Sequence, residues 1–95
     1  MVYQLSGESQ PVIEVLFFAS IREQLGISGL SFSLEDERAS ICSFRQQLIA
    51  RHGGNWSEVL CADNVVIAVN QQVVNDQHLL TDGDELAFFP PVTGG

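Results

Sequence analysis

The chain has 95 residues, twelve acidic against four basic, and a net charge of −8, with 45% hydrophobic residues. A chain of this length and apolar content forms one domain with one core, which excludes an α/β barrel, a two-domain enzyme and a disordered tail. The acidic balance excludes nucleic acid and anionic membrane surfaces as partners, because both require clustered positive charge, and it favours a partner with a basic surface.

The N-terminal part predicts a strand followed by a short helical turn. Residues 1–11 are polar and end at a proline, so we expect a flexible extension. Residues 12–19 (VIEVLFFA) are rich in β-branched and aromatic side chains, which predicts a strand. Its alternation places Ile13, Val15 and Phe17 on the core face. We expect Ser20 to cap a helical turn that ends at Gly26.

The middle of the chain predicts a second strand and the main helix. Residues 30–34 (LSFSL) alternate and should pair with the first strand as a hairpin. A charged connection at 35–39 precedes Ser40, the expected N-cap of a helix that ends at Gly53 and Gly54. The apolar residues of this helix recur at helical spacing: Ile41, Phe44, Leu48 and Ile49. Residues 55–60 predict one more turn, with Trp56 and Val59 pointing inward.

The C-terminal part predicts three more strands. Residues 65–69 form an apolar strand, 70–71 a turn, and 72–74 a short strand. The TDGDE segment at 81–85 is a turn by composition and leads into the last strand at 86–89. The element order indicates an α+β fold, a mixed sheet packed on one main helix in a β-grasp arrangement. We expect one domain over 12–89 and a tail over 90–95.

Neither membrane segments nor metal-binding cysteine patterns are present. The longest apolar runs, 15–19 and 86–92, are far shorter than the roughly 20 residues that span a bilayer. The first residues lack a signal-peptide pattern, so we expect a cytoplasmic location. Cys42 and Cys61 lack the spacing of a zinc site, a disulfide framework or an iron–sulfur cluster, and we expect two reduced thiols and no bound metal.

The sequence contains none of the local signatures of dinucleotide, phosphate, acyl-transfer or zinc chemistry. His52 lies near the end of the main helix, where a solvated or charge-compensating role is expected. His78 lies in a polar loop. The acidic clusters at 35–37 and 82–85 lack the spacing of a calcium loop, so we interpret them as solvated charges.

The residue types of the C-terminal tail suit a segment that projects from the domain. Pro90 and Pro91 project the chain away from the last strand, and Gly94 and Gly95 carry no side chain, so the tail can thread a narrow channel. Four residues beyond Pro91 reach up to roughly 14 Å, enough to place a terminal carboxylate inside another protein's active site. A frayed chain end is the alternative interpretation.

The same alternation predicts an exposed apolar patch. If Ile13 and its face point inward, Leu16 and Phe18 point away from the core, and Phe89 does so on the last strand. Should the first and last strands be neighbours, Phe18 and Phe89 would form a patch at the root of the tail. Such patches usually mark a partner surface. The alternative is that the N-terminal segment of the chain covers this region.

Three blocks of sequence carry a family resemblance: VLFFASIRE at 15–23, AVNQ at 68–71, and LTDGDELAFFPPVTGG at 80–95. With them the chain resembles the small, sulfur-carrier subunits of molybdopterin synthase, members of the MoaD/ThiS family of ubiquitin-like β-grasp proteins. The resemblance covers the chain from residue 12 onward, although residues 26–63 match only in pattern.

The resemblance implies that the chain carries sulfur on Gly95. An activating enzyme similar to ubiquitin E1 would use ATP to adenylate Gly95, which then becomes a thiocarboxylate. The tail of Val92, Thr93 and Gly94 would carry the sulfur into the large catalytic subunit of a heterotetramer, where it passes to a cyclic pyranopterin phosphate to build the molybdopterin dithiolene. The chain itself would hold no permanent cofactor and perform no catalysis alone. The implied partner contacts are Phe18, Arg22, Val73 and Phe89.

Three other functions remain open at this point. A sulfur carrier for thiamine thiazole synthesis shares the fold and the Gly-Gly end, although the FFPPVTGG segment favours molybdopterin. A ubiquitin-like modifier would be conjugated to target lysines through the same terminus. A plain interaction domain would have an inert tail.

Overall fold

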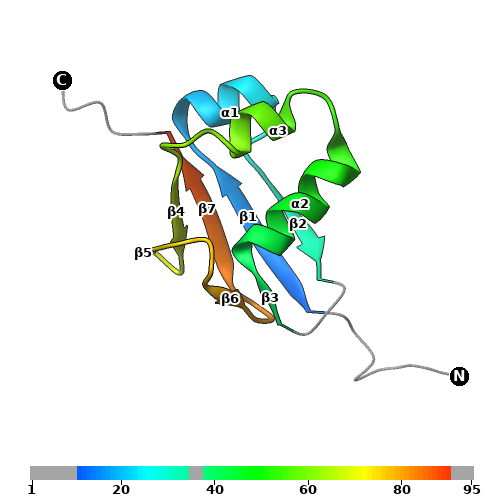
Figure 1. Cartoon of the computed structure of the whole chain (residues 1–95), viewed down its shortest axis with the longest axis vertical. Coiled ribbons are helices and arrows are strands. Elements are labelled where there is room, and N and C mark those ends of the chain that lie inside the picture. Colours follow the sequence, from blue (N-terminus) through cyan, green and yellow to red (C-terminus); the bar gives the residue numbers. More distant parts are fainter. Residues whose placement is uncertain (1–10, 35–37, 91–95) are drawn as a thin grey trace, which may run out of the picture.

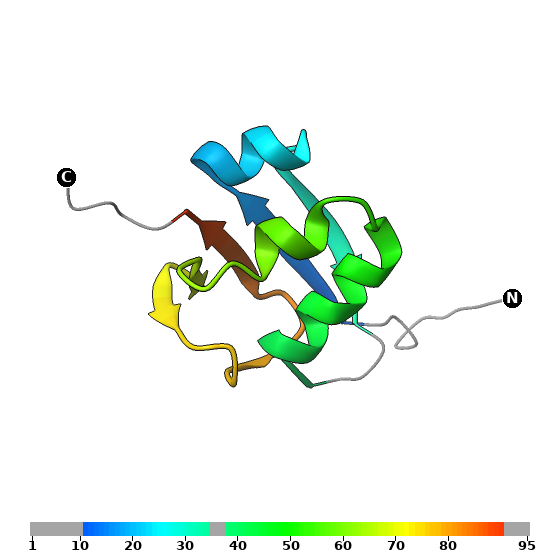
Figure 2. The same ribbon diagram turned by 45° about the horizontal axis from the view of Figure 1, so that its top comes forward.

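The computed structural model describes residues 11–34 and 38–90 and shows a five-stranded sheet packed against helices (Figure 1). The strands lie in the order β2 (Gly29–Ser33), β1 (Val12–Phe17), β7 (Glu85–Phe89), β4 (Val66–Val69) and β5 (Gln72–Val74). The helices are α1 (Ala19–Leu25), α2 (Ile41–His52) and α3 (Trp56–Leu60). Two short strands, β3 (Ala39–Ser40) and β6 (Leu79–Leu80), pair separately. Figure 2 shows α2 and α3 on the same face of the sheet.

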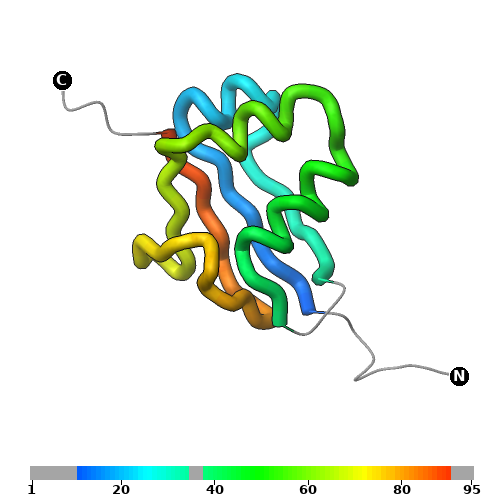
Figure 3. Tube along the Cα trace, viewed as in Figure 1, coloured from blue at the N-terminus to red at the C-terminus, as the bar shows by residue number. Residues whose placement is uncertain are grey.

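The first and last strands lie side by side at the centre of the sheet. β1 and β7 are parallel, with Glu14 opposite Glu85 and Phe17 opposite Phe88, whereas the other neighbours in this sheet are antiparallel. The trace in Figure 3 shows both strands running toward the end of the sheet where α1 begins. The mixed β-grasp sheet predicted from the element order is therefore confirmed.

The core lies between the sheet and the helices. Ile13, Val15 and Phe17 are buried, which confirms the predicted inner face of β1. The Phe17 ring packs edge-on against Trp56, with ring centroids 5.5 Å apart, and stacks with Phe88, with ring centroids 5.9 Å apart. The predicted apolar face of α2 is also correct, since its buried side chains are Ile41, Phe44 and Leu48, with Ile49 packed at the margin. Burial of these side chains is the main stabilising contribution to the fold.

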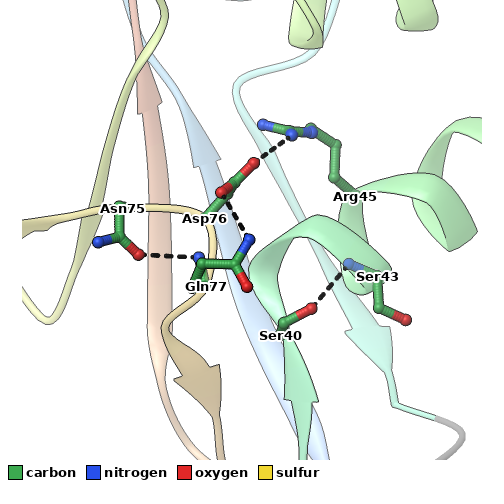
Figure 4. Close-up of polar contacts among 6 residues, drawn as sticks. All are labelled: Ser40, Ser43, Arg45, Asn75, Asp76 and Gln77. Atoms are coloured by element: carbon green, nitrogen blue, oxygen red, sulfur yellow. Dashed lines mark hydrogen bonds and ion pairs between the residues drawn. The ribbon is translucent and has the colours of Figure 1, made fainter.

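Helix α2 begins and ends as the sequence predicts. The Ser40 hydroxyl accepts a hydrogen bond from the Ser43 backbone N–H at 3.1 Å (Figure 4), which satisfies one of the free donors at the helix start. At the other end Gly53 has a φ of +66° and caps the helix. An ion pair of 3.1 Å joins Arg45 of α2 to Asp76 after β5, so the same helix also holds this loop (Figure 4).

The predicted start of α1 is two residues too late. The strand ends at Phe17 rather than at residue 19, Phe18 is the N-cap residue, and Ser20 lies inside the helix without capping it. The cause is Ala19, whose φ of +53° turns the chain immediately after the strand. The carbonyl of Phe18 then accepts the N–H of Ile21 at 3.1 Å. The predicted stop at Gly26, with a φ of +84°, is confirmed.

The sequence pattern does not predict the strand pair β3–β6. It predicts a charged connection at residue 39 and no element at 79–80, yet Ala39 pairs with Leu80. The predicted 81–85 turn is present, and β7 begins one residue earlier than expected, at Glu85. The acidic side chains of this turn are expected from the sequence to be solvated charges, but two of them also accept backbone hydrogen bonds. Asp82 accepts the Val12 N–H and Asp84 accepts the Thr81 N–H, both at 2.9 Å.

The predicted N-terminal extension, the acidic cluster at 35–37 and the tail beyond Pro90 lie outside the described residues. The predictions of a flexible N-terminal extension, of solvated charges at 35–37 and of a projecting tail therefore stay predictions. Among the described helices, none combines the length and the apolar character that crossing a membrane requires.

Candidate functional site: an apolar groove at the root of the tail

The outer face of the sheet, opposite the core, carries the predicted aromatic pair. The Phe18 and Phe89 rings stack with centroids 4.7 Å apart and planes 3° from parallel. Phe18 is 36% exposed and Phe89 is half-buried. The parallel pairing of β1 with β7 causes this contact, because it brings the ends of both strands to the same place. The predicted patch is therefore confirmed.

The patch forms one wall of an open groove of about 530 Å³, which we call the outer groove. It is lined by Phe18, Ala19, Val66, Ala68, Gln71, Val73, Phe89 and Pro90. Register explains its shape. Ala68 of β4 lies opposite Ala87 of β7 and Val73 of β5, all on the outer face. The two alanines are only 5% and 6% exposed although no helix covers them in the described part of the chain, because larger side chains rise around them.

The tail leaves the domain directly from this groove. Pro90 lines the groove and follows Phe89 in the chain. A partner seated on the groove is therefore next to the start of the tail. The residues predicted to carry and position sulfur, Val92 to Gly95, lie outside the described residues, and their roles stay predictions.

The predicted partner contacts do not all fall on the groove. Val73, which is 75% exposed, is one of the lining residues, and its role as a partner contact stays a prediction. Arg22 is exposed on α1, one helical turn after Phe18, and does not line the groove. Its assignment as a partner contact stays a prediction.

Four lining residues were not identified from the sequence: Ala19, Val66, Ala68 and Gln71. Ala68 and Gln71 belong to the AVNQ block, so this block was the sequence signal from which they could have been identified. Its residues reach the groove because β4 places Ala68 on the outer face and the following turn places Gln71 at the rim.

The other chemically versatile side chains serve the fold or face solvent. The His52 ring stacks on Trp56 with centroids 3.9 Å apart, a contact that the expected solvated role did not include. The backbone carbonyl of His78 accepts the N–H of Ile41 at the start of α2. Cys42 and Cys61 are free thiols, as expected. Over residues 11–34 and 38–90, no group of His, Cys, Asp and Glu side chains could hold a metal ion.

Known proteins resemble this chain in both sequence and structure. The molybdopterin synthase sulfur carrier subunit of Escherichia coli is 42% identical over 84 residues, which cover 88% of this chain and 100% of that protein. A solved protein–protein complex of subunits 1 and 2 of the molybdopterin-converting factor from Helicobacter pylori contains a chain with a TM-score of 0.61 and 26% identity, covering 88% of this chain and 99% of that one.

A third similar protein has a different described role. The crystal structure of small archaeal modifier protein 1 from Haloferax volcanii has a TM-score of 0.74 and 25% identity, and the match covers 86% of this chain and 99% of that one. The sequence pattern of the ThiS family matches residues 15–95, which include all the residues that line the groove. The chain therefore belongs to the ThiS family.

Proposed function

We propose that this chain is the sulfur-carrier subunit of a molybdopterin synthase. The observation that carries the proposal is the position of Pro90, which lines the outer groove and begins the tail, so docking and delivery start from the same place. Two findings support it: the similarity to the E. coli sulfur carrier over that protein's whole length, and the likeness to a chain solved in a two-subunit complex.

In this proposal the outer groove docks the large catalytic subunit. Its aromatic and aliphatic lining suits apolar side chains of the partner, which gain free energy by leaving water. The net charge of −8 favours a partner with a basic surface and accelerates their encounter. The assembly is a heterotetramer, with a central pair of large subunits and one carrier at each end.

The tail is the reactive part of the carrier, with Gly95 as its C-terminal residue. On an E1-like enzyme, the Gly95 carboxylate attacks the α-phosphate of ATP and releases pyrophosphate. A free carboxylate is a poor acyl donor, whereas the acyl-adenylate offers AMP as a good leaving group. A sulfur nucleophile displaces AMP and leaves a thiocarboxylate. Neither ATP nor any other cofactor stays bound to the carrier.

The large subunit then uses the thiocarboxylate as a sulfur donor. The thiocarboxylate sulfur displaces an oxygen substituent of a cyclic pyranopterin phosphate and forms a thioester. Water then hydrolyses the thioester, which leaves the sulfur on the pyranopterin and restores the Gly95 carboxylate. A dithiolene contains two sulfur atoms and each carrier delivers one, so carriers act in succession. The carrier contributes a substrate and a docking surface, and the large subunit contributes the catalytic groups. These reactions belong in the cytoplasm, which cell fractionation can test.

Deletion of Gly95 tests this function in a reconstituted synthase. The full chain, loaded as the thiocarboxylate, should convert the cyclic pyranopterin phosphate to molybdopterin in the presence of the large subunit. The chain lacking Gly95 should bind the large subunit but form no product. Product formation that is unchanged by the deletion would show that the terminus is not the sulfur donor.

A ubiquitin-like modifier is the second candidate, favoured by the likeness to the small archaeal modifier protein. It predicts higher-mass adducts on immunoblots that disappear when Gly95 is removed. Binding assays separate the remaining sulfur-carrier alternative, since a carrier for thiamine thiazole synthesis should prefer the thiazole-forming enzyme over the molybdopterin synthase large subunit.

A further inference from the structure

The non-glycine residues with positive φ angles in the described part of the chain lie in or next to the outer groove. They are Ala19 at +53°, Asn70 at +50° and Gln71 at +72°. Ala19 and Gln71 line the groove, and Asn70 directly precedes Gln71. This conformation is unfavourable for residues with a Cβ, and such residues concentrate at functional sites.

Asn70 has a clear structural reason for its conformation. Its side-chain amide donates to Asp84 at 3.0 Å, and its side-chain oxygen accepts the Glu85 N–H at 3.1 Å. Its backbone N–H donates to the Glu85 carbonyl at 2.8 Å. Asparagine also tolerates the left-handed region better than most residues. The turn between β4 and β5 is thereby fixed to the start of β7.

Gln71 has no such reason within the fold. It occupies the second position of the two-residue turn between Val69 and Gln72, and both turn residues have the positive φ angles that a type I′ turn requires. Glycine is strongly preferred at this position. The Gln71 side chain is exposed, and its amide makes no hydrogen bond to another residue of the described part of the chain.

The surroundings of Gln71 indicate what it can recognise. The other residues that line the groove are aromatic, aliphatic or proline, so Gln71 supplies the only polar side chain of the lining. A carboxamide is neutral and both donates and accepts hydrogen bonds. A peptide group of a partner main chain has the complementary donor and acceptor. The hydrogen bonds of Asn70 already fix the turn, so little backbone freedom is lost when Gln71 makes this contact.

We propose that Gln71 is a specificity-determining residue whose carboxamide hydrogen-bonds to the main chain of the large subunit while the apolar groove is filled. This inference rests on the proposed docking function. The apolar lining excludes water, and Gln71 selects a partner segment whose main chain is free to pair at the rim. The unfavourable backbone at Gln71 is kept because glycine would remove this contact.

Binding of the full chain to the molybdopterin synthase large subunit tests the proposal, with dissociation measured by surface plasmon resonance. Q71G removes the carboxamide and also the steric cost of a positive φ angle at this position. The thermal midpoint should therefore stay equal or rise, while the dissociation constant should rise about five- to tenfold. Most of the change should lie in the dissociation rate. Q71E keeps the shape but loses the donor, and should weaken binding similarly. Q46A, an exposed residue of α2, is the matched control and should change nothing.

The outcomes separate this inference from the proposed function. If F89A weakens binding and Q71G does not, the Gln71 contact is wrong and the docking groove stands. If neither change weakens binding, the groove is not the docking surface and the proposed function loses its structural support. If Q71G weakens binding but Q71E does not, the loss comes from a more flexible turn, and the hydrogen-bonding role is overturned.

Discussion

Two adjacent phenylalanines provide a direct test of the two faces of the sheet. Phe88 points into the core and is fully buried, whereas Phe89 lies half-buried on the outer face and stacks on Phe18 at 4.7 Å. Replacement of Phe88 by alanine should lower the free energy of unfolding by about 3 to 5 kcal/mol, the usual cost of truncating a core aromatic. Phe89→Ala removes one aromatic stack and part of a side chain's burial, so its cost should be about 1 to 2 kcal/mol.

Partner binding should show a large effect for Phe89. A partly exposed aromatic side chain in the wall of a docking groove becomes buried in the complex, and interface aromatics of this kind can contribute about 2 kcal/mol or more. Phe89→Ala should therefore weaken binding to the large subunit by about 30-fold. Phe88→Ala has no contact with the partner, so the fraction of this variant that remains folded should bind normally.

Urea denaturation and isothermal titration calorimetry measure the two quantities separately. Denaturation gives the free energy of unfolding of each variant, and calorimetry below the unfolding transition gives the dissociation constant. A Phe89→Ala variant that loses as much stability as Phe88→Ala, or that binds the large subunit as tightly as the original chain, would refute the assignment of Phe89 to a docking surface.

Two further predictions concern the fold. Ser40→Ala removes the acceptor of the Ser43 N–H and should lower the free energy of unfolding by about 1 kcal/mol in urea denaturation, whereas Ser43→Ala should not; equal losses would contradict the capping role. Gly29→Ala would place a Cβ 2.7 Å from the Val15 carbonyl oxygen, a backbone atom of the central strand, and should cost about 1 to 3 kcal/mol. Ser33→Ala, on the same face of β2, is its control, and a Gly29 variant as stable as this control would show that the two strands separate easily.

The local pattern of the sequence was enough to predict the central strands and the main helix. Alternation along β1 correctly separates Phe17, which is buried, from Phe18, which is exposed, because period-two patterning depends only on the strand itself. Ser40 and Gly53 mark the ends of α2 because capping is also local.

Features that depend on distant contacts could not be predicted in this way. The pairing of Ala39 with Leu80 joins two very short strands from distant parts of the chain, and neither carries a strand pattern. The left-handed conformation of Ala19 has no sequence signal, because alanine rarely adopts it, and the sequence therefore predicts Ser20 as the cap. Tertiary contacts decide both features.

The candidate site also combines features that the local sequence predicts with features that depend on distant contacts. The aromatic pair follows from alternation and from the neighbouring positions of the first and last strands, and so was predicted as an exposed patch. The groove beside it depends on Ala68 and Ala87 meeting in register on the outer face, which requires knowledge of the pairing of β4 with β7. The position of Gln71 at the rim likewise requires the geometry of the turn.

The most direct test of the account is the intact mass of the chain after incubation with its activating enzyme, ATP and a sulfur donor. The account predicts a mass increase equal to the replacement of one oxygen by sulfur, located by fragmentation in the C-terminal peptide at Gly95. An unchanged mass, with the enzyme shown to be active on a control carrier, would contradict the sulfur-carrier function.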